Sequence, residues 1–282
     1  MYRYLSSFLV AALAILLASA PSRAQDLEVR STPDNAPGYT KSEKDYARSD
    51  PGYFTINPDS VKVTLLSVKD EQGPDYVQLQ EQPPKDVANI LVSVDQIVNI
   101  ASKVWEIVKD NKPVVAISTK YAAAYPYGVT AANQLASWSR PKSYEYGFYA
   151  ENLYGAVMID CKYKFSFSYN GAYKGIGKFL TGVAVIPSNV TAGWGYKFYM
   201  NAEVPDSTIV NVGTDANPVA AMQMKLSWKM STVLKEVTGT SVYYVDGSGY
   251  FEEIASPWKN RPAKKLADFE ASAPLLDPAR VF

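Results

Sequence analysis

The chain of 282 residues contains no histidine and a single cysteine, Cys161. Without histidine, the Ser-His-Asp and Cys-His mechanisms, His-ligated zinc and a histidine pH switch are all excluded. With one cysteine, the chain can form neither an intrachain disulfide nor a cysteine-rich metal site. We therefore expect a non-catalytic protein with no metal and no cofactor.

Neither sign of charge is in excess, because lysine plus arginine and aspartate plus glutamate both number 28. A balanced chain exerts no long-range attraction on a polyanion. We therefore expect no nucleic-acid partner, and any partner must be recognised by a local surface.

A long uninterrupted apolar run occurs at the start of the chain, where residues 8–18 read F-L-V-A-A-L-A-I-L-L-A after the cation Arg3. Ser22 and Ala24 place small residues where a signal peptidase reads the chain. The run is shorter than the roughly 20 residues of a membrane-spanning helix, which disfavours an uncleaved anchor. Residues 1–24 are thus predicted to be a signal peptide of bacterial style, removed near Ala24. The mature protein is expected in the periplasm or outside the cell.

Alternation with a period of two is the strongest pattern in the chain. Residues 157–169 read V-M-I-D-C-K-Y-K-F-S-F-S-Y, with an apolar or aromatic side chain at every odd position. This pattern predicts a β-strand with one buried face and one solvated face. Cys161 lies on the apolar face and has no histidine to activate it, so it is predicted to be a core residue rather than a reactive thiol.

The same alternation recurs in residues 194–202 and 222–230. In the first of these segments the polar face carries Lys197, Tyr199 and Asn201. Long strands with one apolar face must close against a second sheet or a helix.

Turn signals separate the predicted strands. Asn170-Gly171 is the preferred dipeptide of a two-residue hairpin, and residues 246–249, D-G-S-G, form a second candidate for a tight turn. Strands that are joined by short turns must be antiparallel, because a parallel return requires a long crossover.

A stripe of apolar residues at spacings of three and four predicts one amphipathic helix over residues 85–111. The helix would begin after Pro83-Pro84 and end before Pro113. The charges on its polar face are balanced, which favours packing along the sheet over insertion into a membrane. The stripe consists of Val87, Ile90, Leu91, Val94, Ile97, Val98, Ala101, Val104, Trp105 and Val108.

The predicted fold class is mainly β (α+β): an antiparallel β-sandwich with long strands and one long amphipathic helix packed on it. The predicted organisation is a signal peptide (1–24), a flexible N-terminal arm (25–55), a single β-sandwich domain that includes the helix (56–255) and a proline-rich C-terminal extension (256–282).

Tyrosine is abundant, with 21 residues. Its side chain combines an apolar ring with a hydrogen-bonding hydroxyl, which suits surfaces that bind sugars, proteins or lipid headgroups. The alternative interpretation is an aromatic-rich core. The candidate ligand-binding residues are Tyr121, Tyr125, Tyr127, Tyr144, Tyr146, Tyr149 and Tyr154.

Three functions remain open. The first is a secreted, non-catalytic binding or interaction protein that uses the tyrosine-rich surface for a glycan or a protein. The second is a membrane-active or pore-forming protein in which helix 85–111 engages a lipid membrane, an order of elements that resembles the actinoporin-type cytolysins in architecture alone. The third is a carboxylate-based hydrolase, although adjacent Glu252 and Glu253 would point to opposite faces of a strand.

Overall fold

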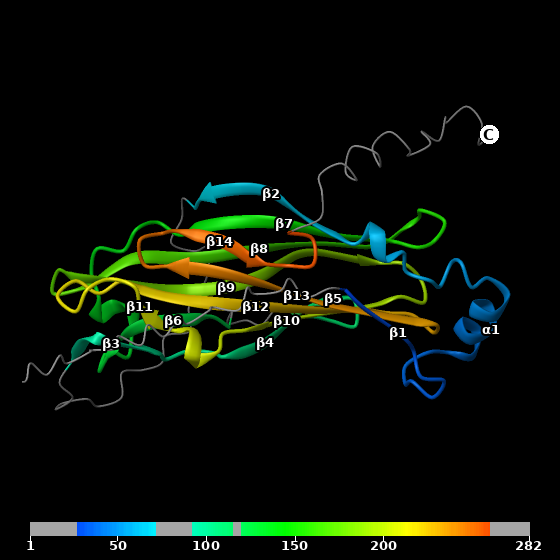
Figure 1. Ribbon diagram of the computed structural model, residues 1–282, viewed down its shortest axis with the longest axis horizontal. Coiled ribbons are helices and arrows are strands. Elements are labelled where there is room, and N and C mark those ends of the chain that lie inside the picture. The colour runs from blue at the N-terminus through cyan, green and yellow to red at the C-terminus, as the bar shows by residue number, and fades with distance from the viewer. Residues whose placement is uncertain (1–26, 72–91, 115–119, 260–282) are drawn as a thin grey trace, which may run out of the picture.

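The computed structural model describes residues 27–71, 92–114 and 120–259. Within them, two antiparallel sheets of eight and six strands form an open β-sandwich. Figure 1 shows the strands running along the longest axis of the molecule, with the helix α1 (Lys41–Ser49) at one end. The prediction of a mainly β, antiparallel sandwich with long strands is therefore confirmed.

One sheet consists of β1 (Glu28–Ser31), β4 (Val104–Lys109), β5 (Lys112–Pro113), β10 (Lys197–Glu203), β11 (Val210–Asn211), β12 (Ala220–Ser231), β13 (Lys235–Asp246) and β14 (Phe251–Ala255). Its strand order is β1-β13-β12-β10-β4-β5, with β11 paired to β12 and β14 paired to β13.

The other sheet consists of β2 (Lys62–Asp70), β3 (Ser93–Asn99), β6 (Ala122–Tyr127), β7 (Lys142–Glu151), β8 (Val157–Tyr173) and β9 (Ile176–Ala192). Its strand order is β2-β7-β8-β9-β6-β3. Short 3-10 helices lie at Pro58–Ser60, Ala132–Gln134 and Asp206–Thr208.

β8 is the long central strand that the alternation predicts. Burial raises the pKa of the Cys161 thiol to about 12, so the prediction of a core cysteine is confirmed. The side chains of its inner face that are at most 2% exposed are Ile159, Cys161, Tyr163, Phe165 and Phe167.

Aromatic side chains join the two sheets. The ring of Phe148 on β7 lies 4.9 Å, between centroids, from both Phe198 on β10 and Trp228 on β12. Phe165 on β8 lies 4.3 Å from Tyr243 on β13. The long strands thus close on one another through clusters of aromatic rings, which bury large apolar surfaces.

The turn between β8 and β9 differs from the prediction. Lys174 and Gly175 form it, with φ angles of 50° and 82°, so Asn170-Gly171 does not turn the chain. Asn170 instead has a φ of 62° inside β8, where the ladder with β9 shifts its register. The ring of Trp138 packs directly against Gly171, where a side chain would collide with it. A tertiary contact therefore makes this dipeptide a bulge.

The second predicted turn, over residues 246–249, is confirmed. Gly249 N donates a hydrogen bond to the carbonyl oxygen of Asp246 at 3.0 Å, and Ser248 N donates to the Asp246 carboxylate at 2.8 Å. The φ of Gly249 is 89°, a conformation that glycine adopts without steric cost. This turn joins β13 to β14.

The predicted helix 85–111 is wrong over the part that the structure describes, where β3 and β4 form instead. Its first residues, 85–91, lie outside the described residues. Along β4, Trp105 and Ile107 are 5% and 1% exposed, whereas Glu106 between them is exposed. From Val104 to Ile107 exposed and buried side chains therefore alternate, which is the pattern of a strand rather than the stripe of a helix.

The apolar stripe was ambiguous because valine and isoleucine dominate it. β-Branched side chains lose rotational freedom in a helix and pack well on a sheet, so they favour strands. Asp110 and Asn111, with φ angles of 46° and 65°, form the two-residue turn that joins β4 to β5. The backbone of β4 then forms its hydrogen bonds with β10, as a strand must, whereas a helix would form them within itself.

Replacing Asn111 by alanine should lower the free energy of unfolding by about 1–3 kcal/mol. Asn111 Nδ2 donates to the Tyr196 carbonyl oxygen at 2.7 Å, and its Oδ1 accepts from Phe198 N at 2.6 Å. Urea unfolding followed by tryptophan fluorescence measures the change. Asn111→Gly also lacks both side-chain bonds, but glycine adopts this backbone conformation without strain, so its free energy of unfolding should fall less than that of Asn111→Ala. An alanine variant as stable as the native chain would contradict this account.

The described part of the predicted flexible arm, residues 27–55, packs on the sandwich. β1 adds an edge strand to β13, and α1 begins with a capping box between Thr40 and Glu43. Phe54 is 1% exposed. Over these residues the segment therefore packs on the sandwich.

Of the predicted C-terminal extension, the structure describes residues 256–259. The indole of Trp258 stacks on Trp228 at 6.1 Å and donates from Nε1 to Glu253 at 2.8 Å. The predicted signal peptide, residues 1–24, lies outside the described residues.

Candidate functional site

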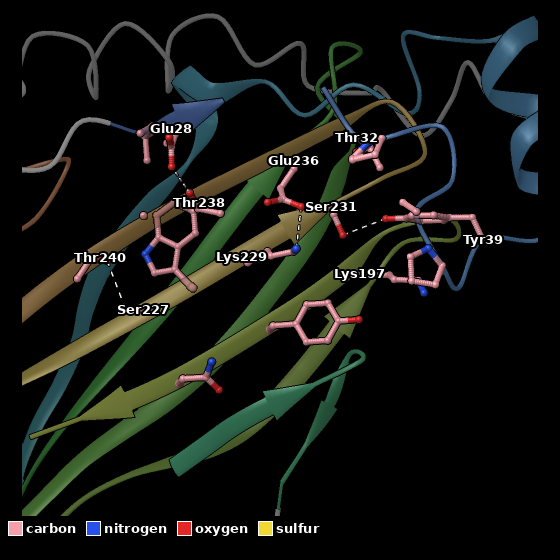
Figure 2. A pocket seen from close by; sticks show the side chains of 18 residues that line it. Glu28, Thr32, Tyr39, Lys197, Ser227, Lys229, Ser231, Glu236, Thr238 and Thr240 are labelled. Carbon is pink, nitrogen blue, oxygen red and sulfur yellow. Dashed lines mark hydrogen bonds and ion pairs between the residues drawn. The ribbon is translucent and has the colours of Figure 1, made fainter. Parts of the chain in front are cut away.

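A groove of about 1020 Å³ lies on the outer face of the eight-stranded sheet. β10, β12 and β13 form its floor, and the N-terminal segment that includes β1 contributes the rest of its lining, up to Tyr39 (Figure 2). Segments that are far apart in the sequence therefore build this site together.

The polar floor follows from strand alternation. On β10, Phe198 and Met200 are fully buried in the core, so Lys197, Tyr199 and Asn201 point to the opposite face. The ladders align these side chains with polar residues of the next two strands, and neighbours in such rows lie close enough to interact. The rows are Lys197, Ser231 and Glu236; Tyr199, Lys229 and Thr238; and Asn201, Ser227 and Thr240.

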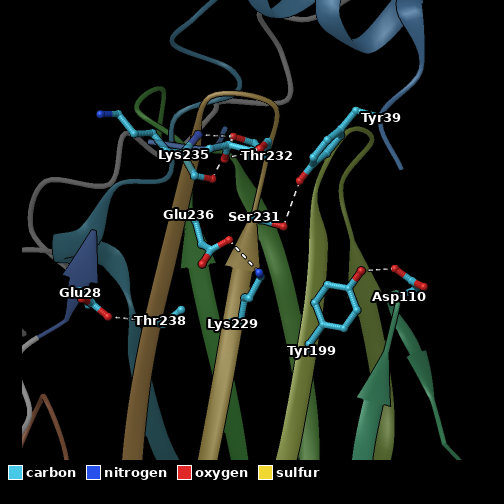
Figure 3. A network of polar contacts seen from close by, with 11 residues as sticks. Glu28, Tyr39, Asp110, Tyr199, Lys229, Ser231, Thr232, Lys235, Glu236 and Thr238 are labelled. Carbon is cyan, nitrogen blue, oxygen red and sulfur yellow. Dashed lines mark hydrogen bonds and ion pairs between the residues drawn. The ribbon is translucent and has the colours of Figure 1, made fainter. Parts of the chain in front are cut away.

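Polar contacts hold the floor in place. Lys229 Nζ lies 2.7 Å from Glu236 Oε2. Thr238 Oγ1 donates to Glu28 Oε2 at 3.4 Å, which links β13 to β1 (Figure 3). Because these groups already have partners, the floor is a pre-arranged network rather than a set of mobile side chains.

The N-terminal segment is tied to the end of β12. Thr32 Oγ1 donates to the carbonyl oxygen of Thr232 at 2.8 Å, and Thr32 N donates to that of Leu234 at 3.1 Å. The hydroxyl of Tyr39 donates to Ser231 Oγ at 2.9 Å (Figure 3). These bonds position the ring of Tyr39 beside the floor.

Tyr39 and Tyr199 are the two tyrosines of the groove. The Tyr199 hydroxyl donates to the carboxylate of Asp110, in the turn between β4 and β5 (Figure 3). Burial raises the pKa of Tyr199, and the bond to Asp110 raises it further; burial also raises the pKa of Tyr39. Both hydroxyls therefore stay protonated at neutral pH, and each ring offers an apolar face with a fixed polar end.

Lys197 lies beside Tyr39 at one end of the groove (Figure 2). Its Nζ is 4.8 Å from the centroid of the Tyr39 ring, which is a cation–π distance. The groove thus contains ring faces, hydroxyls, an amide and charges of both signs.

Two of the seven tyrosines predicted to bind a ligand are core residues. Tyr125 and Tyr146 are 1% and 5% exposed. The hydroxyl of Tyr125 lies 2.6 Å from Thr181 Oγ1, and the ring of Tyr146 stacks on Tyr163 at 5.7 Å. These two side chains pack the interior of the sandwich.

Tyr144 and Tyr149 are half-buried on opposite faces of β7. Tyr144 stacks on Phe251 with 4.2 Å between ring centroids. The hydroxyl of Tyr149 donates to Glu151 at 2.9 Å, and Lys62 Nζ lies 4.8 Å from its ring. The structure therefore separates these two side chains.

The remaining three lie in or beside β6 and in the loop between β7 and β8. Tyr121 is half-buried, and Tyr127 is 48% exposed. Tyr154 is 68% exposed and donates from its hydroxyl to Asp50 at 2.7 Å. All seven belong to the six-stranded sheet or its adjoining residues, and the groove is lined by other residues.

Sequence reasoning did not single out the groove residues, although part of the signal was present. Tyr199 stands between Lys197 and Asn201 on the polar face of a predicted strand, where an outward-facing tyrosine marks a candidate surface. Tyr39 falls in the segment predicted to be a flexible arm, and no local pattern links it to β10.

The lining of the groove combines hydrogen-bond donors, acceptors and aromatic rings. No group of three or more cysteine, aspartate or glutamate residues that could hold a metal ion occurs in the part of the chain that the structure describes. Such a concave surface is more polar than the usual small-molecule site, which is lined mainly by apolar side chains.

The fold and this groove define the chain as an open antiparallel β-sandwich with a polar groove on one outer face. No family model, curated protein or solved structure matches the chain. No helix within residues 27–71, 92–114 and 120–259 is long and apolar enough to cross a membrane.

Proposed function

We propose that this is an exported, non-catalytic protein that binds a glycan in the groove over β10, β12 and β13. The observation that carries the proposal is the lining, where the rings of Tyr39 and Tyr199 flank a floor of hydroxyl, amide and charged side chains. Its volume of about 1020 Å³ reaches the upper end of the usual range of ligand pockets, about 300–1,000 Å³, which suits several sugar rings.

A sugar matches this surface because it is itself two-faced. Its C–H groups pack on the apolar face of a tyrosine ring, while its hydroxyls both donate and accept hydrogen bonds. Asn201, Ser227 and Thr240 offer both kinds of group side by side in one row of the floor. A pre-arranged floor also reduces the entropy lost on binding.

A glycan is favoured over a protein ligand by the polarity of the floor. The centre of a stable protein interface is depleted of charge and contains desolvated aromatic or aliphatic anchors. Here the row through the middle of the floor contains Tyr199, Lys229 and Thr238, and Lys229 is held in an ion pair.

Tyr199→Ala should weaken glycan binding at least about tenfold, since truncation removes a ring face and a fixed hydroxyl. A glycan array on the mature chain selects a ligand, and isothermal titration calorimetry then compares the variants. Tyr127→Ala and Tyr154→Ala, which change exposed tyrosines outside the groove, should bind normally. Weaker binding in those two variants with normal binding in Tyr199→Ala would move the site to the six-stranded sheet. No binding on the array would overturn the proposal.

The other two functions receive less support. The membrane-active alternative required helix 85–111, and the described part of that segment forms strands. For the hydrolase, the groove carboxylates Glu28 and Glu236 are each bonded to a cation, Arg30 and Lys229. We therefore expect the bound glycan to remain intact, which an assay for new reducing ends measures.

A further inference from the structure

Lys197 differs from the other charged side chains that line the groove. Glu28 Oε1 accepts from Arg30 Nε at 2.8 Å, and Lys229 Nζ lies 2.7 Å from Glu236. Those charges are therefore neutralised within the protein. Among the described residues, no carboxylate lies within 4.0 Å of Lys197 Nζ.

The acidic residues around this end of the groove also have partners already. The Glu43 carboxylate accepts from Thr40 N at 2.6 Å and from Thr40 Oγ1 at 2.8 Å, in the capping box of α1. The Asp110 carboxylate accepts from the hydroxyl of Tyr199. Neither of these carboxylates forms an ion pair with Lys197, so its ammonium has no acidic partner within 4.0 Å among the described residues.

The ammonium of Lys197 has neighbours on two sides. It lies over the ring of Tyr39, whose hydroxyl is fixed by its bond to Ser231. On another side it packs against the backbone of Gly38, where any side chain would collide with Nζ. Gly38 has a φ of 87°, which a residue with a Cβ rarely adopts. A cation that is positioned before binding loses little entropy when it pairs with an anion.

We propose that the ligand of the groove is an anionic glycan and that Lys197 binds its carboxylate or sulfate group. This inference rests on the proposed function, because it assigns a charge to the same ligand. The ammonium donates charge-assisted hydrogen bonds to the anion while the sugar rings occupy the polar floor. Lys229 differs from Lys197 because its charge is paired with Glu236.

The test uses the mature chain and pairs of oligosaccharides that differ only in charge. One pair is a uronic-acid oligosaccharide and its methyl ester, and the other is a sulfated oligosaccharide and its desulfated form. Calorimetry at low salt should show that the charged member of at least one pair binds about tenfold or more tightly than its neutral form. The pair that shows the preference identifies the anionic group.

The variants assign the preference to Lys197. Lys197→Met should abolish the difference between charged and neutral ligands, and Lys197→Arg should retain most of it. Gly38→Ala keeps the charge but displaces the ammonium, so it should reduce the preference. Lys225→Met is the matched control, because Lys225 faces the same side of β12 outside the groove and pairs with Glu203 at 3.9 Å. Equal urea midpoints show that each variant folds.

The outcomes separate this inference from the proposed function. Equal affinity for both members of each pair overturns the anionic ligand and leaves glycan binding in place. A Lys197→Met variant that loses affinity for charged and neutral ligands equally overturns the role of Lys197 as the anion partner. No binding of any oligosaccharide overturns the proposed function and this inference together.

Discussion

Phe148→Ala is expected to lower the free energy of unfolding by about 3–5 kcal/mol. Phe148 is fully buried on β7, and its ring packs against Phe198 and Trp228 on the opposite sheet. Truncation removes this apolar surface and leaves a cavity where the two sheets meet. The surrounding strands are long and paired on both sides, so they cannot collapse into the space.

Urea unfolding monitored by tryptophan fluorescence measures this loss, and Trp228 itself reports on the site. Phe148→Leu fills part of the cavity and should lose less than the alanine variant. Leu153→Ala, at a side chain that is 56% exposed in a loop, should change stability by less than about 1 kcal/mol. If Phe148→Ala and Leu153→Ala were equally stable, Phe148 would not join the sheets.

Raising the pH above about 10 should unfold the protein steeply, because ionisable tyrosines are built into the core. The hydroxyls of Tyr163 and Tyr243 lie 3.4 Å apart between the two sheets. Burial raises the pKa of both well above its usual value, and it also raises the pKa of Tyr146 and Tyr196. These side chains stay neutral in the folded protein.

Stability should fall as the pH rises, because the folded and unfolded states bind different numbers of protons. Above about pH 10 the unfolded chain releases tyrosine protons that the folded core retains, so the unfolded state binds fewer protons and gains stability. Tyr163 and Tyr243 should each contribute a loss of about 1.4 kcal/mol per pH unit in this range. Cys161 acts in the same direction from about pH 9, because burial raises its pKa to about 12. With no histidine in the chain, stability should be nearly constant from about pH 6 to 8.

Urea midpoints measured from neutral to alkaline pH test this expectation. Tyrosinate absorbance should rise in two stages, first from exposed tyrosines in the folded state and then together with unfolding. Tyr243→Phe removes one titrating group, so it should reduce the loss of stability by about 1.4 kcal/mol per pH unit in this range. The prediction fails if stability is unchanged through pH 11, or if Tyr243→Phe retains the native slope.

Part of the fold could be predicted from the sequence because alternation is a local property. Each residue of a strand faces away from its neighbour, so β8 could be assigned an inner face through Cys161 and Phe165 before any partner strand was known. The helix prediction for residues 85–111 was wrong over the described part because the valines and isoleucines of this segment fit a helical stripe and two strands equally well. Pairing with β10 and the turn at Asp110 and Asn111 decided between them.

The candidate site was predictable only in part, for the same reason. The polar face of β10 was evident from its alternation, whereas the tyrosines chosen from local clusters were divided among the core, two faces of a sheet and a loop. Tyr125 and Tyr146 are buried, yet they were predicted to bind a ligand. The sequence pattern of a tyrosine-rich segment is the same whether its hydroxyls reach solvent or pack inside the protein.

The sequence by itself determined the excluded chemistries and the long two-faced strands, since composition and period need no knowledge of distant contacts. Only the tertiary structure decided where the hairpin between β8 and β9 turns, and that a groove exists. At Asn170-Gly171 the ring of Trp138 packs against the strand, and at one end of the groove Tyr39 lies beside Lys197. Both are contacts between segments far apart in the chain, and no local pattern specifies them.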